Sequence, residues 1–95
     1  MDEKQIEKYI KLEVEKLGGI CLKFVSPGVT GVPDRVLIFP DAIAYWVEVK
    51  RDGGKLTPRQ EYVIRQFKKR GHAVAVVRGM DEARHFIERL KNATT

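Results

Sequence analysis

Three side chains near the middle of the chain have the types and spacing of a hydrolytic site. Asp34 precedes the apolar run 36–39, and Glu48 and Lys50 lie two residues apart in the segment 44–50. Residues two apart on a strand point to the same face. Carboxylates brought together in a sheet repel each other and lose hydration, which favours a divalent cation between them. Ligands that are all oxygen indicate a hard cation, Mg²⁺ or Mn²⁺.

Lys50 adds a positive charge on the side of the strand that Glu48 occupies. An amine there could orient a water nucleophile or stabilise the negative charge that develops on a phosphate oxygen. With a metal ion, these groups predict hydrolysis of a phosphodiester. The spacing Glu-x-Lys is also typical of an exposed ion pair on a strand, so the tripeptide alone does not separate the two interpretations.

Local signals predict three helices around this set. Apolar residues at three- and four-residue spacings indicate a helix from Asp2 to about Leu17, which Gly18-Gly19 ends. Thr57, Pro58 and Gln60 have the pattern of a capping box with proline at the first helical position, so a second helix is expected to run to about Arg70. Asp81 is expected to cap the last helix.

Strands are expected between the helices, at 20–25, 36–39, 44–50 and 73–77. The run 36–39 is wholly apolar, which predicts cover on both faces, and the helix before 73–77 predicts that the last two strands are parallel. The fold class is therefore α/β: one small domain in the order α-β-β-β-α-β-α, with a mixed sheet flanked by helices. The domain is expected over residues 1–91, followed by a short tail without pattern at 92–95.

Charge is distributed unevenly along the chain. The 95 residues carry a net charge of +5. Residues 1–47 sum to −1 and residues 48–95 to +6. A basic half suits a polyanion such as nucleic acid, although solvated helix faces are often equally basic. The residues expected to contact nucleic acid are Lys23, Arg35, Arg51, Lys55 and Arg59, and Arg35 has the alternative role of neutralising Asp34.

Composition excludes several classes of protein. No apolar run approaches the length of a membrane span, and the N-terminus lacks the features of a secretory signal. Cys21 is the single cysteine, so a disulfide within the chain is ruled out. Its side chain is expected to serve as a small buried apolar group. A cytoplasmic location, in a bacterium or a phage-infected host, is expected.

Three segments of the sequence resemble a known family when they are taken together. They are Gly31-Val32-Pro33-Asp34-Arg35, Trp46-Val47-Glu48-Val49-Lys50 and Leu56-Thr57-Pro58-Arg59-Gln60. In this order and in a chain of this size they resemble the VRR-NUC (virus-type replication-repair nuclease) domains of the PD-(D/E)XK nuclease superfamily. The resemblance extends from the first helix to the last strand and implies a restriction-endonuclease-like fold.

The resemblance also implies roles for individual residues. Asp34 and Glu48 would be metal ligands, the carbonyl of Val49 would complete the metal shell, and Lys50 would be the catalytic lysine. Gln60 would be a polar residue of the active site, although the capping box explains it about as well.

The family pattern includes a glutamate on the first helix, for which this chain has two candidates. Glu3 lies three residues before Ile6, as in the family's Glu-x-x-Ile start, whereas Glu7 is nearer the first strand. The two lie one helical turn apart and could face the same site. Glu3 is slightly favoured.

The function expected from residues and resemblance is a Mg²⁺- or Mn²⁺-dependent DNA endonuclease. The resemblance implies action on structured DNA, including four-way junctions, and a homodimer that cuts symmetrically, to which apolar residues such as Val29, Val32, Tyr45 and Trp46 could contribute. One alternative is a catalytically silent nucleic-acid-binding module. Another is a nuclease subunit that serves a separate helicase or primase.

Overall fold

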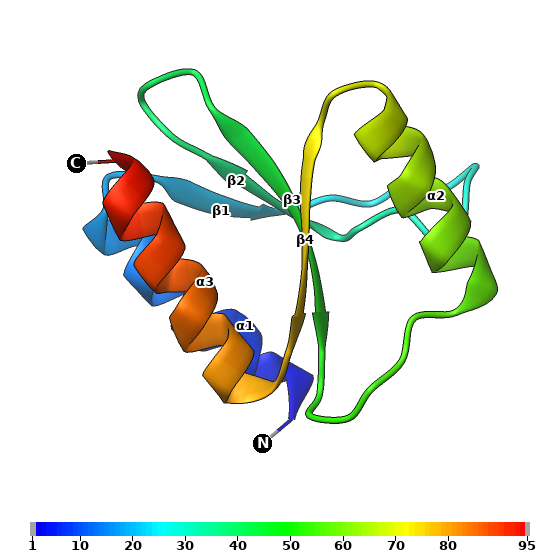
Figure 1. Ribbon diagram of the computed structural model, residues 1–95, viewed down its shortest axis with the longest axis horizontal. Helices are drawn as coiled ribbons and strands as arrows, with labels where there is room; N and C mark the ends of the chain where they lie inside the picture. The colour runs from blue at the N-terminus through cyan, green and yellow to red at the C-terminus, as the bar shows by residue number, and fades with distance from the viewer. Residues whose placement is uncertain (1, 95) are drawn as a thin grey trace.

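The computed structural model describes residues 2–94, which form three helices and four strands (Figure 1). In chain order the elements are α1 (Glu3–Lys16), β1 (Ile20–Lys23), β2 (Arg35–Ile38), β3 (Ala44–Lys50), α2 (Pro58–Lys69), β4 (Ala73–Arg78) and α3 (Gly79–Thr94). The predicted order α-β-β-β-α-β-α is confirmed.

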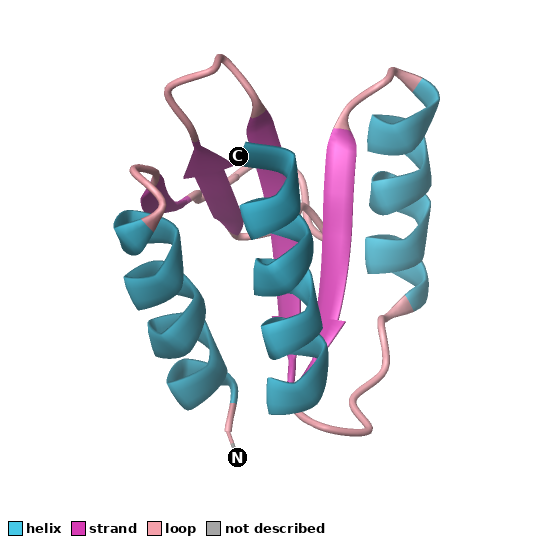
Figure 2. Cartoon of the chain, turned by 60° about the vertical axis from the view of Figure 1, so that its left-hand side comes forward, coloured by secondary structure: helices cyan, strands magenta, loops and turns pink. Residues whose placement is uncertain are grey.

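The four strands form one mixed sheet in the order β1-β2-β3-β4. The pairs β1–β2 and β2–β3 are antiparallel, and β3–β4 is parallel, as the helical crossover predicts. Helices α1 and α3 lie side by side on one face of the sheet, and α2 lies on the other (Figures 1 and 2).

The main core lies between the sheet and the pair α1–α3. Helix α1 contributes Ile6, Ile10 and Val14, which recur at four-residue spacing and are almost fully buried. Val47 and Val49 meet them from β3, as the period of two predicts. Cys21 packs against this core as a free thiol, and burial raises the pKa of that thiol.

The face beneath α2 is held mainly by aromatic contacts. The ring of Trp46 meets Phe24 edge-on at a centroid distance of 5.1 Å and Phe67 of α2 at 5.0 Å. Val63 and Ile64 are the buried apolar residues of that helix. Trp46 therefore links α2 to the chain that leaves β1.

Two expectations about the strands are wrong. Strand β1 ends at Lys23 instead of continuing to Val25. The run 36–39 is covered on one face only, because α2 packs over the β4 side and leaves the β1–β2 side open. Ile20 and Ile38 are register partners on that open face and are 51% and 38% exposed.

Two expectations about the last helix are also wrong. Gly79 has a φ of +77° and turns the chain directly from β4 into α3, so Asp81 lies inside the first turn and is not its cap. The Arg78 N–H instead donates to the Glu82 carboxylate at 2.9 Å. The helix also continues through residues 92–94, which the sequence predicts as a tail.

Candidate active site

The site forms where β3 extends beyond the start of β2. The last register pair of β2 with β3 is Arg35 with Val47, whereas β3 continues to Lys50 along β4. Asp34 prolongs the β2 line, since its carbonyl accepts the Phe24 N–H at 2.8 Å. Continuing the register therefore sets Asp34 opposite Glu48. Opposed residues of antiparallel strands point to the same face, so the two carboxylates converge.

Among residues 2–94, Glu48 is the one charged residue that is buried, with 7% of its surface exposed. Across residues 2–94 its carboxylate accepts no hydrogen bond and forms no ion pair. Its pKa is raised from 4.5 to about 7, first by burial and then by the negative charge of Asp34, whereas Lys50 opposes the shift. The alternative of an exposed ion pair between Glu48 and Lys50 is therefore wrong.

This raised pKa predicts how stability depends on pH. Because the folded protein holds the Glu48 proton more tightly than the unfolded chain, the free energy of unfolding falls as pH rises from 4.5 to about 7. Glu48→Gln removes that loss and is expected to raise stability by roughly 2–3 kcal/mol at neutral pH and by almost nothing at pH below about 4.5. Thermal melting of both proteins in EDTA across this range measures the difference. A difference that does not change with pH would contradict the assigned pKa.

The turn before Asp34 is fixed against the start of α2. Gly31 has a φ of +85°, and a Cβ there would lie 2.8 Å from the Arg59 carbonyl oxygen. The Arg59 side chain in turn donates from Nε to the Thr30 carbonyl at 3.3 Å. Pro33, directly before Asp34, is fully buried. This close approach of turn and helix positions the Asp34 carboxylate.

Gln60 forms the predicted capping box of α2. The Gln60 N–H donates to Thr57 Oγ1 at 3.1 Å, and the Thr57 N–H donates to Gln60 Oε1 at 2.9 Å. The capping interpretation is confirmed, and it occupies the amide oxygen of the side chain. A catalytic role for Gln60 stays a prediction.

The donors at this site fit a hard cation with mixed ligands. Among residues 2–94, no group of three or more His, Cys, Asp or Glu side chains is arranged to hold a metal ion. A main-chain oxygen is therefore needed beside the two carboxylates. In an antiparallel strand, the backbone N–H and C=O groups of successive residues point alternately to the two neighbouring strands. Those of Asp34 point to β1, so those of Arg35 point to β3. The backbone groups of Val47, the register partner of Arg35, therefore point to β2. The backbone groups of Val49, two residues further along β3, point to the same side, at a position beyond the first residue of β2.

The two candidate glutamates of α1 have different surroundings. Glu7 accepts a hydrogen bond from the Arg35 guanidinium at 2.8 Å, and both side chains are about one-fifth exposed. Glu3 is exposed in the first turn and has no ion-pair partner among residues 2–94. Both glutamates raise the pKa of Glu48, Glu3 more than Glu7. The expected role of Arg35 in neutralising Asp34 is wrong, because its partner is Glu7.

Glu3→Gln and Glu7→Gln are expected to differ in stability and in activity. Glu7→Gln removes a part-buried ion pair and is expected to lower stability by about 1–3 kcal/mol. Glu3→Gln changes an exposed group and is expected to leave the melting temperature unchanged while slowing DNA cleavage. Melting curves and cleavage rates of both variants check this. Full cleavage activity in Glu3→Gln would remove Glu3 from the site.

The other predicted contacts for nucleic acid are partly brought together. Lys23 and Arg51 line one depression of about 540 Å³, which also includes Glu3 and Glu7. Lys55 is exposed in the turn before α2, away from that lining. Arg59 lies on the opposite side of the sheet, where it bonds to Thr30 and stacks over the Tyr62 ring at 5.2 Å.

Three lysines of α1 are not among the contacts for nucleic acid that the sequence predicts. Lys4, Lys8 and Lys11 line a second depression, of about 390 Å³, together with Lys23 and Arg35. Their spacing of four and three residues places them on one side of the helix and was visible in the sequence. The charge sums obscured it, because residues 1–47 are acidic overall.

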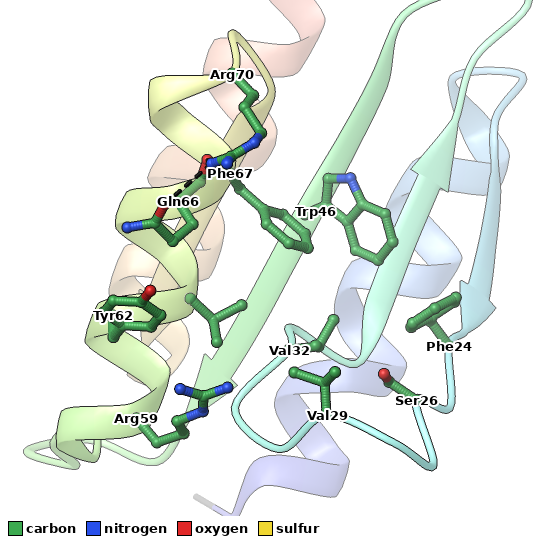
Figure 3. Close-up of a pocket in the computed structure, with 11 residues that line it drawn as sticks. Phe24, Ser26, Val29, Val32, Trp46, Arg59, Tyr62, Gln66, Phe67 and Arg70 are labelled. Carbon is green, nitrogen blue, oxygen red and sulfur yellow. Dashed lines mark hydrogen bonds between the residues drawn. The ribbon is translucent and has the colours of Figure 1, made fainter.

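An apolar groove of about 590 Å³ lies on the α2 side of the sheet (Figure 3). Trp46 and Phe67 form its centre, Val29 and Val32 of the turn close one side, and Tyr62 of α2 the other. Tyr45, expected beside Trp46 at a subunit interface, instead packs against Phe39 and Phe86 in the core.

Comparison with known proteins assigns this arrangement to a family. The sequence model of the VRR-NUC domain matches residues 2–81, which include Asp34, Glu48, Lys50 and Gln60. The chain belongs to the VRR-NUC domain family. A protein named "Putative nuclease p44", from Acyrthosiphon pisum secondary endosymbiont phage 1, is 44% identical over 79 residues, covering 83% of this chain and 85% of that protein.

Solved structures agree with the family assignment. A structure described as a VRR-NUC domain has a TM-score of 0.86 and 37% identity, and the match covers 90% of this chain and 94% of that one. A second, described as a VRR-NUC domain protein, has a TM-score of 0.71 at 18% identity, covers 96% and 86%, and supports the fold alone. The VRR-NUC assignment supports nuclease function. No helix in the described part of the chain has the length and apolar character needed to cross a bilayer.

Proposed function

We propose that this VRR-NUC domain is a divalent-metal-dependent endonuclease that hydrolyses phosphodiester bonds in DNA. The observation that supports this most is the buried Glu48 carboxylate, which has no hydrogen-bond partner and meets Asp34 at the end of β3. A buried acid in that position is unfavourable unless a cation or a proton compensates it. VRR-NUC nuclease domains generally use divalent metals, and the donors here fit one.

Each group at the site has a chemical role in this proposal. The Asp34 and Glu48 carboxylates, with the Val49 carbonyl, would hold Mg²⁺ or Mn²⁺. Such an ion, when bound, polarises the phosphate and lowers the pKa of water. Lys50, on the Glu48 face of β3, orients the attacking water or stabilises charge on the phosphate oxygen. Glu3 is the first choice for the α1 acid.

Substrate choice by DNA shape fits the size of the domain. A chain of 95 residues has little surface with which to read base edges, whereas phosphate contacts need only placed cations. A four-way junction is a two-fold substrate that needs two symmetrical cuts, which a C₂ dimer supplies. The open β1–β2 face, with Ile20, Leu22 and Ile38 exposed, offers an apolar surface for a second copy.

The proposal is tested by metal-linked stability together with cleavage of a substrate panel. Mg²⁺ or Mn²⁺ should raise the melting temperature of the wild type and not of Asp34→Asn/Glu48→Ala, because a ligand that binds only the folded state stabilises it. Cleavage rates on linear, flapped, splayed and four-way DNA then show which substrate is preferred. Light scattering measures the molecular mass of the protein in solution. Equal thermal shifts in both proteins would place the metal elsewhere. A monomer that releases only nicked products would contradict the dimer.

A further inference from the structure

A strongly basic groove lies beside α1, apart from the pair Asp34–Glu48. We use "basic groove" for the depression of about 390 Å³ lined by Lys4, Glu7, Lys8, Lys11, Lys23 and Arg35. Its one carboxylate, Glu7, is already neutralised by Arg35 at 2.8 Å. The four lysines that remain are exposed and have no ion-pair partner within residues 2–94. The groove therefore concentrates uncompensated positive charge.

Helix geometry and strand register explain why these cations meet. Helix α1 buries Ile6, Ile10 and Val14, and Lys4, Lys8 and Lys11 follow a stripe beside that buried face. Lys23 and Arg35 are register partners at the ends of β1 and β2, so their side chains share one face of the sheet. Because Arg35 reaches Glu7 of α1, that shared face is the α1 side.

The basic groove continues toward the candidate active site. The adjoining depression of about 540 Å³ shares Lys4, Glu7 and Lys23 with it and extends to Asp2, Glu3 and Arg51. Arg51 directly follows Lys50 in the chain. Cations, together with the carboxylates of Asp2 and Glu3, therefore extend along the α1 side of the sheet to the end of β3, where Glu48 and Lys50 point to the other face.

We propose that the basic groove binds the sugar-phosphate backbone of duplex DNA next to the bond that is cut. This inference rests on the proposed function, which supplies the cutting site at one end of the groove. Lysine ammonium groups bind phosphate as point charges and carry no base specificity, which suits recognition of DNA by shape. Arg35 acts here as a positioning residue that removes the repulsion between Glu7 and the phosphates.

The test is DNA binding by Lys4→Gln/Lys8→Gln/Lys11→Gln as a function of salt. A fluorescent duplex of arbitrary sequence is titrated in EDTA, so that binding is read without cleavage. Each phosphate contact contributes about 0.9 to the slope of log K against log salt concentration. The triple variant is expected to bind roughly tenfold or more weakly at low salt, with a slope less steep by about 2–3. Unchanged affinity and slope would overturn the proposal.

Two matched variants separate the groove from net charge. Arg65→Gln/Lys68→Gln/Lys69→Gln removes the same charge from exposed positions of α2 and is expected to keep most of the affinity. Lys4→Arg/Lys8→Arg/Lys11→Arg keeps the charge of α1 and is expected to bind as the wild type does. Equal losses of DNA affinity in the two triple Gln variants would overturn the proposal that the basic groove binds DNA. Wild-type binding without any metal-dependent cleavage would contradict the proposed function while leaving the groove result valid.

Discussion

Glu48→Gln is expected to lower the rate of DNA cleavage in saturating Mg²⁺ by about 1000-fold or more and, in EDTA, to make the protein more stable. The amide cannot hold a divalent cation as a carboxylate does, and loss of one group that stabilises a transition state commonly removes two to three orders of magnitude. The stability gain follows because Glu48 is buried without a partner. Single-turnover cleavage and thermal melting are measured on the same preparations.

Asp34→Asn and Lys50→Ala are expected to act in the same direction on cleavage. The three effects should not add, because the groups work as one unit. Glu15→Gln, an exposed position of α1, is the matched control and should change neither rate nor stability. Cleavage by Glu48→Gln at more than about one-tenth of the wild-type rate would remove Glu48 from the catalytic residues.

Gly31→Ala is expected to reduce both stability and cleavage. An alanine at a φ of +85° costs about 1–2 kcal/mol, and its Cβ would lie 2.8 Å from the Arg59 carbonyl oxygen. Together these predict a loss of about 2–4 kcal/mol. Any shift of the turn moves Asp34, and a displacement of about 1 Å at a reacting group can slow a reaction roughly 100-fold.

Gly28→Ala provides the control for the same loop. A Cβ at Gly28 meets no atom within 4 Å, so the substitution should be neutral or stabilise the protein by less than about 1 kcal/mol. Melting temperatures and cleavage rates of the two variants are compared. If Gly31→Ala cleaves DNA as fast as Gly28→Ala does, the turn does not position Asp34.

Local patterns predicted the parts of this fold that local physics controls. The capping box of Thr57 and Gln60 forms within four consecutive residues, and Glu48 and Lys50 share a face because a strand has a period of two. Residue types and position suggested Asp34 and Glu48 as a cation-binding pair, whereas the family resemblance supplied the expected roles of Val49 and Gln60. These roles need long-range register, which composition and periodicity do not contain.

Several features that the sequence did not predict depend on tertiary packing. Ile38 is exposed because α2 packs over the β4 side of the sheet, a choice that the run 36–39 cannot encode. Arg35 pairs with Glu7 across 28 residues of sequence. The end of β1 at Lys23 reflects where the chain turns away to form the loop before Asp34. Each of these contacts joins segments far apart in the chain.

Nicking of covalently closed circular DNA tests the central claim most directly, because such DNA has no ends. Purified wild type is incubated with a supercoiled plasmid carrying a cruciform, in Mg²⁺ or Mn²⁺ and in EDTA, beside Glu48→Gln. The account predicts open or linear DNA from the wild type with metal only, and no product from Glu48→Gln under any condition. If the wild type cuts linear DNA but leaves the plasmid intact, the protein is not an endonuclease. If Glu48→Gln cuts the plasmid as well as the wild type does, the metal-dependent site is not centred on Glu48.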